Sequence, residues 1–146
     1  MPGSDEPSGE EGPSGGGGAF ARGGGDWFGP LGQLDFDIDF FERLLGRSPD
    51  HVEGLRVLGE LCSRKGLLGR ALEIDRRLVT LLPDDALARY NLACSLALVG
   101  RDDEALAHLG DAFRLGYDDV AHMEVDPDLA SLRGRPEFRA LLDRAV

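Results

Sequence analysis

The sequence lacks both an apolar stretch long enough to cross a membrane and a region of excess positive charge. No apolar run approaches the roughly 18 residues that a membrane-spanning helix needs. The N-terminus does not combine a basic segment with an apolar core, as a secretory signal does. The net charge is −11, so the basic surface that holds nucleic acids or acidic lipids is missing. We therefore expect a cytoplasmic protein that binds neither nucleic acid nor membrane.

Cysteine and histidine are also scarce, and neither is arranged for chemistry. The two cysteines, Cys62 and Cys94, form no CxxC pair, so we expect packing residues rather than a disulfide. None of the three histidines has another three or four positions away, where one helix would supply two metal ligands. We therefore expect no enzyme activity, no catalytic residue, and no metal, cofactor or small-molecule substrate.

The first 34 residues contain few apolar side chains and 12 glycines. A segment of this composition cannot bury enough apolar surface to offset the entropy lost on ordering. We predict that residues 1–34 are a disordered acidic tail and that residues 35–146 form the folded domain. The tail holds the single Trp of the chain. Trp27 and Phe28 are candidates for a docking motif that binds either a groove of this chain's own folded domain or a partner.

What the sequence does contain is a repeat with a spacing of 34 residues. Residues 52–85 align with residues 86–119, and small residues recur at matching positions: Gly59 with Ala93, Gly66 with Gly100, and Ala71 with Ala105. Such a period is typical of a helical solenoid, in which each repeat is one helix pair. Short side chains at the crossing points let the two helices approach closely. The sequence therefore predicts an all-α fold.

Apolar spacing and helix-ending residues predict the individual helices. The i,i+4 pairs Phe40–Leu44 and Phe41–Leu45 give one face of an orphan helix at 37–46, which would cap the solenoid. Four helices of the two repeats follow, at about 51–65, 68–82, 86–99 and 102–115. A terminal cap over residues 120–146 contains short helical segments at about 120–125, 128–132 and 136–145.

The repeat resembles the tetratricopeptide repeat, in which large, small and proline residues stand at fixed positions. The first unit supplies Leu58, Gly59, Ala71 and Pro83, although Asp75 stands where that family usually has an aromatic residue. The closing stretch DPDLASLRGRPEFRALL is similar to the end-of-group variant that often ends bacterial arrays. The resemblance implies a short right-handed solenoid of antiparallel helix pairs. It also implies a concave face that binds a peptide or helix of a partner protein of unknown identity.

In the tetratricopeptide family the first helix of each pair lines the concave face, so the resemblance implies a set of groove residues. The candidates are Glu53, Arg56, Glu60, Arg64, Leu87, Tyr90, Asn91, Cys94 and Leu98. Tyr90 is open equally to partner binding and to packing against the orphan helix or the tail. Arg56 and Arg64 suit either a ligand carboxylate or pairing with Glu53 and Glu60 on the same helix. An alternative function is that of a structural subunit, which stacks on another helical array.

Overall fold

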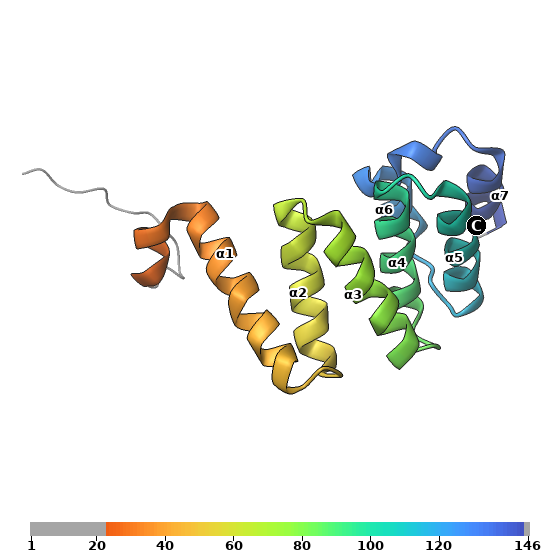
Figure 1. The fold of residues 1–146 in the computed structure, drawn as a ribbon. Coiled ribbons are helices and arrows are strands. Elements are labelled where there is room, and N and C mark those ends of the chain that lie inside the picture. Colours follow the sequence, from red (N-terminus) through yellow and green to blue (C-terminus); the bar gives the residue numbers. More distant parts are fainter. Residues whose placement is uncertain (1–22, 145–146) are drawn as a thin grey trace, which may run out of the picture. The chain divides into compact units, whose positions relative to one another are not determined.

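The computed structural model describes residues 23–144, and their side chains from residue 32 onward. Over these residues the chain is helical and contains no strand, which confirms the all-α prediction (Figure 1). The elements are α1 (Gly23–Arg47), α2 (Val52–Lys65), α3 (Leu68–Leu81), α4 (Ala86–Leu98), α5 (Asp102–Arg114), α6 (Val120–Val125), the 3₁₀ helix η1 (Pro127–Leu132) and α7 (Pro136–Arg144).

Helix α1 begins earlier than the sequence predicts. The orphan helix expected at 37–46 is the C-terminal part of α1, which starts at Gly23 and so includes residues 23–34 of the expected tail. Glycine lowers helix propensity without forbidding a helix, so composition alone placed this boundary wrongly. Residues 1–22 and the side chains of Trp27 and Phe28 lie outside the described residues. Disorder of the tail and docking by the aromatic pair therefore stay predictions.

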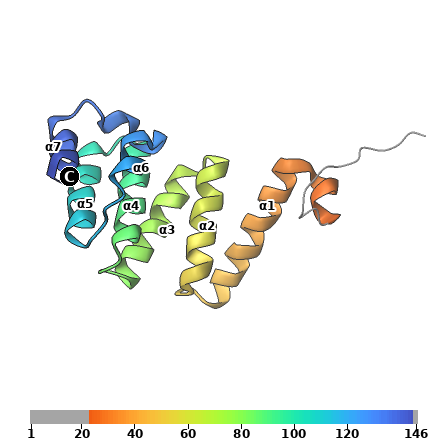
Figure 2. The same ribbon diagram turned by 180° about the vertical axis from the view of Figure 1, so that it is seen from behind.

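The chain divides into two units, residues 1–37 and residues 38–146, and both repeats lie in the second unit. Helices α2 and α3 form one antiparallel pair and α4 and α5 form the next, side by side in both views (Figures 1 and 2). The ends of all four helices agree with the predicted ends to within one residue. Gly66 and Gly100 have φ values of 87° and 84°, the left-handed conformation that ends the first helix of each pair.

Small residues permit the close helix crossings that the repeat predicts. A Cβ atom on Gly59 would lie 3.3 Å from Cγ2 of Ile74. Helices α2 and α3 therefore approach closely at Gly59 because this residue has no side chain. Ala71 is buried, and Ala93 and Ala105 are fully enclosed. Dense helix packing of this kind leaves no room for larger side chains.

The first hydrophobic cluster joins the end of α1 to the first repeat. It contains Leu45, Leu55, Leu58, Cys62, Ala71, Ile74 and Leu78, with Ile38 and Phe41 packed against it. Residues 38–47 of α1 are also attached to α3 by charge, because the Arg70 guanidinium donates to both Glu42 oxygens at 2.6 and 2.9 Å. The C-terminal part of α1 thus covers the exposed side of the first helix pair.

The second cluster joins α4 and α5 to the terminal segment. Met123, Leu129, Leu132 and Phe138 of that segment are fully buried against α4 and α5. The terminal helices lie over the second pair in both ribbon views (Figures 1 and 2). Residues 120–144 thus form short helices that pack on the second repeat, and their assignment as a terminal cap of the end-of-group variant stays a prediction.

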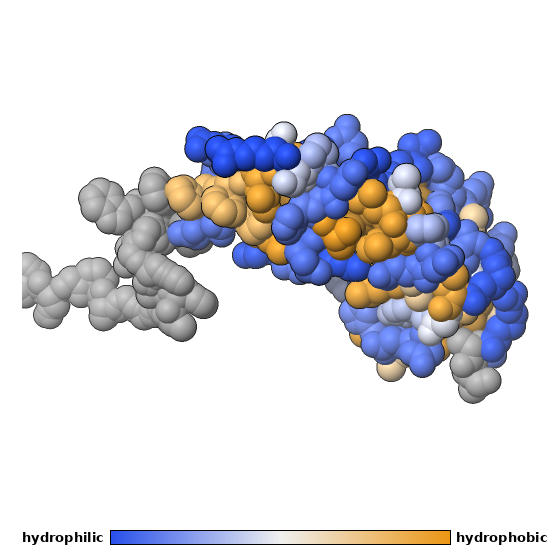
Figure 3. All heavy atoms as spheres, turned by 90° about the horizontal axis from the view of Figure 1, so that it is seen from below, coloured by the Kyte–Doolittle hydropathy of each residue, from blue (hydrophilic) through white to orange (hydrophobic). Residues whose placement is uncertain are grey.

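None of the helices within residues 23–144 is long and apolar enough to cross a membrane. Some apolar side chains nevertheless reach the surface of the protein. On the face shown in Figure 3 they lie in separate patches between hydrophilic side chains. The large exposed apolar residues of the second unit are Phe40, Val57, Leu67, Leu87, Val99 and Val125. Of these residues, Leu87 also lines a groove of the repeat domain.

Candidate functional site

A groove of about 440 Å³ lies between the first helices of the two repeats, with α3 and the terminal segment completing its walls. We call it the central groove. Its lining is Arg56, Gly59, Glu60, Ser63, Asp75, Leu78, Leu87, Tyr90, Asn91, Cys94, Ser95, Leu98, His122, Asp126 and Asp128. Because α2, α3, α4, α6 and η1 all belong to the second unit, the groove is formed within that unit.

Most of the groove residues expected from the repeat positions line this one groove. They are Arg56, Glu60, Leu87, Tyr90, Asn91, Cys94 and Leu98. Glu53 and Arg64 are exposed on α2 and do not line it. No pattern in the sequence indicated Ser95, His122, Asp126 or Asp128 as groove residues. Asp75 had a signal, since an acid stands where the family usually has an aromatic residue.

Tyr90 is a packing residue that also lines the groove. Its side chain is 3% exposed and its ring stacks on Tyr117 with centroids 4.3 Å apart. Its hydroxyl donates a 2.6 Å hydrogen bond to Oδ2 of Asp126. Burial raises the pKa of Tyr90, and the bond to Asp126 adds to this, so the phenol stays protonated. Tyr90 thus packs against Tyr117 and Asp126, and no contact with the orphan helix is among its interactions within the described residues.

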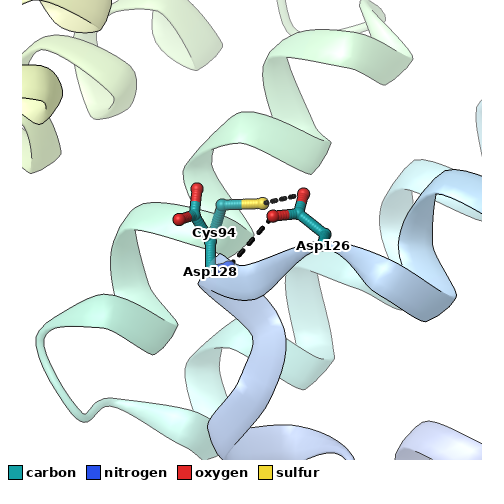
Figure 4. A group of neighbouring side chains, drawn as sticks. All are labelled: Cys94, Asp126 and Asp128. Carbon is teal, nitrogen blue, oxygen red and sulfur yellow. Dashed lines mark hydrogen bonds between the residues drawn. The ribbon is translucent and has the colours of Figure 1, made fainter.

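The partner of Tyr90, Asp126, holds the terminal segment against α4. Its Oδ1 accepts from the backbone N–H of Asp128 at 3.0 Å, and its Oδ2 lies 3.2 Å from Nε2 of His122. The Cys94 thiol points to the same carboxylate, with Sγ 3.7 Å from Oδ2 (Figure 4). A buried carboxylate is tolerated when several donors satisfy it. Asp126 therefore links α4, α6 and η1.

Cys94, Asp126 and Asp128 form the one group within the described residues whose ligand atoms lie close enough to hold a metal ion, all within 4.8 Å of one another. A cysteine must be deprotonated to bind a metal. Burial, and then the charge of Asp126, raise the pKa of the Cys94 thiol well above its usual range. The carboxylate of Asp126 is already used by Tyr90. In the absence of a metal ion the raised pKa keeps the Cys94 thiol protonated at neutral pH, which makes it a poor nucleophile. The expectation that the chain holds no metal stays a prediction.

Asp75 brings a carboxylate from α3 into the groove. It accepts a short hydrogen bond from the Ser95 hydroxyl of α4. Its other oxygen lies 3.5 Å from the place that a Cβ on Gly59 would occupy, so it faces α2 at a residue that has no side chain. Burial raises the pKa of Asp75 to about 6. Asp75 is therefore ionised at neutral pH, but at a cost to folding.

Arg56 forms an ion pair with Asp85 rather than with an acidic residue of its own helix. Its guanidinium lies 3.0 Å from Oδ2 of Asp85, the N-cap of α4. The pKa of Asp85 lies below its usual value, mainly because the carboxylate accepts a hydrogen bond from the Ala88 N–H and also because Arg56 lies beside it. The interpretation that Arg56 pairs with Glu53 or Glu60 is wrong, because the next repeat offers a carboxylate already fixed as a helix cap. Arg56 is thus partly neutralised where it meets the groove.

The comparisons with solved structures identify the fold. The structure described as "Crystal structure of MamA protein" matches with a TM-score of 0.65 at 23% identity, covering 83% of this chain and 67% of that chain. "MamA MSR-1 C2" matches with a TM-score of 0.57 at 19% identity, covering 80% of this chain and 71% of that one. The chain has a tetratricopeptide-type fold. In this tetratricopeptide-type fold, the central groove lies between the first helices of successive repeats, α2 and α4.

A sequence comparison adds one relative among curated proteins. A chloroplastic protein from Arabidopsis thaliana is 31% identical over 104 residues, which are 69% of this chain and 30% of that protein. The chain therefore spans less than a third of the relative's length. No family model matches the sequence. The tetratricopeptide-type assignment thus depends on the helix pairs and their arrangement.

Proposed function

We propose that this protein is a non-catalytic interaction module whose central groove binds a peptide or a helix of a partner protein. The observation that carries the proposal is the groove itself, a hollow of about 440 Å³ with four exposed lining residues, Glu60, Leu87, Asn91 and His122. A volume of a few hundred Å³ is in the range typical of binding pockets. The tetratricopeptide-type fold supports a protein-interaction role in general.

The chemistry of the lining supports binding rather than catalysis. The thiol of Cys94 and the phenol of Tyr90 both have raised pKa values, so neither supplies a nucleophile at neutral pH. The carboxylate of Asp126 is occupied by hydrogen bonds within the fold. The lining thus consists of groups that hold the fold together and groups that face outward to a ligand.

The test is selection of short random peptides by display, with the full-length protein as bait. Asn91 is exposed in the groove, and Asn91→Arg fills part of the space that a peptide would occupy. Ala107→Arg adds the same side chain at an exposed position of α5 that does not line the groove. We expect peptides to be enriched, Asn91→Arg to weaken them at least tenfold, and Ala107→Arg to leave them unchanged. Equal effects of the two variants would contradict groove binding.

The alternative of a structural subunit is tested by light scattering over a concentration series. Phe40, 55% exposed on the C-terminal part of α1, is the observation that favours stacking against another array. A stacking subunit should associate with itself as concentration rises, and Phe40→Gln should abolish that association. We expect a monomer at all concentrations, because one exposed aromatic side chain provides far less area than a stable interface buries.

A further inference from the structure

The central groove carries more negative charge than its own cations balance. Carboxylates enter it from three elements: Glu60 from α2, Asp75 from α3, and Asp126 and Asp128 from the segment that begins η1. The positive or protonatable side chains among the described lining residues are Arg56 and His122. Each already contacts a carboxylate, Asp85 at 3.0 Å and Asp126 at 3.2 Å. The lining of the groove therefore carries a surplus of negative charge.

Three of these carboxylates are available to a ligand. Within residues 32–144, the side chains of Glu60 and Asp128 form no hydrogen bond or ion pair, and Asp75 receives one hydrogen bond, from Ser95. The second oxygen of Asp75 accepts no hydrogen bond from the described residues and faces Gly59, which also lines the groove. Each of the three carboxylates can thus accept further hydrogen bonds from a cation.

Asp75 and Asp128 are also partly removed from water. Burial raises the pKa of Asp75 to about 6 and is the largest cause of the raised pKa of Asp128. A carboxylate that has lost part of its hydration gains more from a cation than one on an open surface does. Leu87 and Leu98 flank this charged region along α4, so the groove offers apolar contact next to it.

Building on the interaction role proposed above, we propose that the central groove receives a Lys or Arg side chain of a partner protein, held between Glu60, Asp75 and Asp128. An apolar side chain close by on the same partner segment packs against Leu87 or Leu98. The occupant is thus a segment that carries a basic and an apolar residue side by side. Charge complementarity of this kind sets specificity as well as the rate of association.

The experiment uses peptides selected by the full-length protein and measures their dissociation constants by fluorescence polarisation. We expect the enriched sequences to share a Lys or Arg with an apolar neighbour. Replacing that basic residue by norleucine should weaken binding about tenfold or more, the loss expected from one hydrogen bond between charged groups. Asp75→Asn and Asp128→Asn should each cause a loss of the same size. Once the peptide lacks its basic residue, neither substitution should have a further effect.

The matched control is Glu53→Gln. Glu53 lies on α2 like Glu60 and is exposed, but it does not line the groove. Glu60→Gln should weaken binding several-fold, whereas Glu53→Gln, with the same change of net charge, should leave it unchanged. Melting temperatures of all variants separate lost binding from lost folding.

The outcomes distinguish the two proposals. Enriched peptides that bind in the groove but share no basic residue would overturn the present inference and leave the interaction role standing. Equal weakening by Glu53→Gln and Glu60→Gln would also overturn it, because the effect would then come from net charge alone. A failure to enrich any peptide, or insensitivity to Asn91→Arg, would instead overturn the proposed function.

Discussion

The two repeats place matching residues in different surroundings. At the groove positions of the first repeat, Glu53, Glu60 and Arg64 are exposed and Arg56 is half-buried. At the matching positions of the second repeat, Tyr90 and Cys94 are buried. The difference arises because α6 and η1 fold over α4, where Asp126 meets both side chains. Position in a repeat therefore does not decide the exposure of a side chain, which depends on the element packed beside it.

The same difference divides the groove by function. The wall formed by α4 and the terminal segment is tied internally by Tyr90, Asp126 and His122. The wall formed by α2 keeps Glu60 free of hydrogen bonds and ion pairs within the described residues. The first wall therefore contains residues that hold the fold together, Tyr90 and Asp126, beside residues that face a ligand, such as Asp128 and Leu87. Substitution of Tyr90 should lower stability, whereas substitution of Glu60 should lower binding.

The largest effect is expected where the terminal segment is anchored. Leu129 of η1 is fully buried against the second repeat, whereas Leu87 of α4 is 50% exposed at the groove. Leu129→Ala should cost about 2 to 5 kcal/mol of unfolding free energy, the usual range for a buried leucine. Leu87→Ala should cost well under 1 kcal/mol, roughly the effect of a surface substitution. Denaturant unfolding of both variants measures the difference, and equal costs would mean that the segment does not cover α4.

Asp75 should lower stability at neutral pH while serving the ligand. Its pKa rises from 3.8 to about 6 on folding, so the folded state binds the proton more tightly than the unfolded state does. Below pH 3.8 both states are protonated and there is no penalty. As pH rises from 3.8 to about 6 stability is lost, and above 6 the full loss remains, up to about 3 kcal/mol for a shift of this size.

The substitution Asp75→Asn isolates this effect, because an amide keeps an acceptor for Ser95 and carries no charge. The variant should be more stable than wild type at neutral pH, and its advantage should shrink as pH falls through 6 towards 4. Melting curves at several pH values measure it, with Glu73→Gln, an exposed acid on the same helix, as the control. An advantage that does not change with pH would rule out the buried charge as its cause. A gain in stability with a loss of peptide binding is typical of a functional residue.

Arg56 and Tyr90 occupy matching positions in the two repeats, and their substitution should change the free energy of unfolding by different amounts. Tyr90→Phe removes the donor to the buried Asp126 and should cost about 1 to 3 kcal/mol, because a buried acceptor loses its partner. At the matching position, Arg56→Met breaks a partly exposed ion pair with Asp85 and should cost less than about 1 kcal/mol. Thermal melts of both variants give the comparison. Should Arg56→Met prove the more costly, the account of the two walls would be wrong.

The helices of both repeats were predictable because their signals are local. The 34-residue spacing, the small residues at the crossings and the glycines that end α2 and α4 are all visible in the sequence, and the structure places them as expected. The start of α1 was not predictable from composition, since a glycine-rich segment can still be helical when it continues an established helix. Local rules thus predicted the repeats more accurately than the boundary before them.

The groove was predictable only in part because half of it depends on distant contacts. Repeat positions placed Arg56, Glu60 and Asn91 on its surface. Asp126 is 36 residues from Tyr90 in sequence. The Asp126-Pro127 pair is typical of a helix end, and nothing in it indicates that its carboxylate returns to α4. Pairing of this kind depends on the packing of η1, which only the folded chain reveals.

The smallest effects should be equal in the two repeats, because the turns that join each helix pair are alike. Gly66 and Gly100 both have positive φ values, and a Cβ there would meet no atom within 4 Å, so only backbone strain opposes an alanine. Gly66→Ala and Gly100→Ala should each cost about 1 kcal/mol. Gly69→Ala, in the exposed first turn of α3 with the same free space, should instead stabilise by up to about 1 kcal/mol through helix propensity. Unfolding midpoints of the three variants test this. A larger loss of stability at Gly100 than at Gly66 would show that the terminal segment constrains the turn after α4, as it does the groove wall that α4 forms.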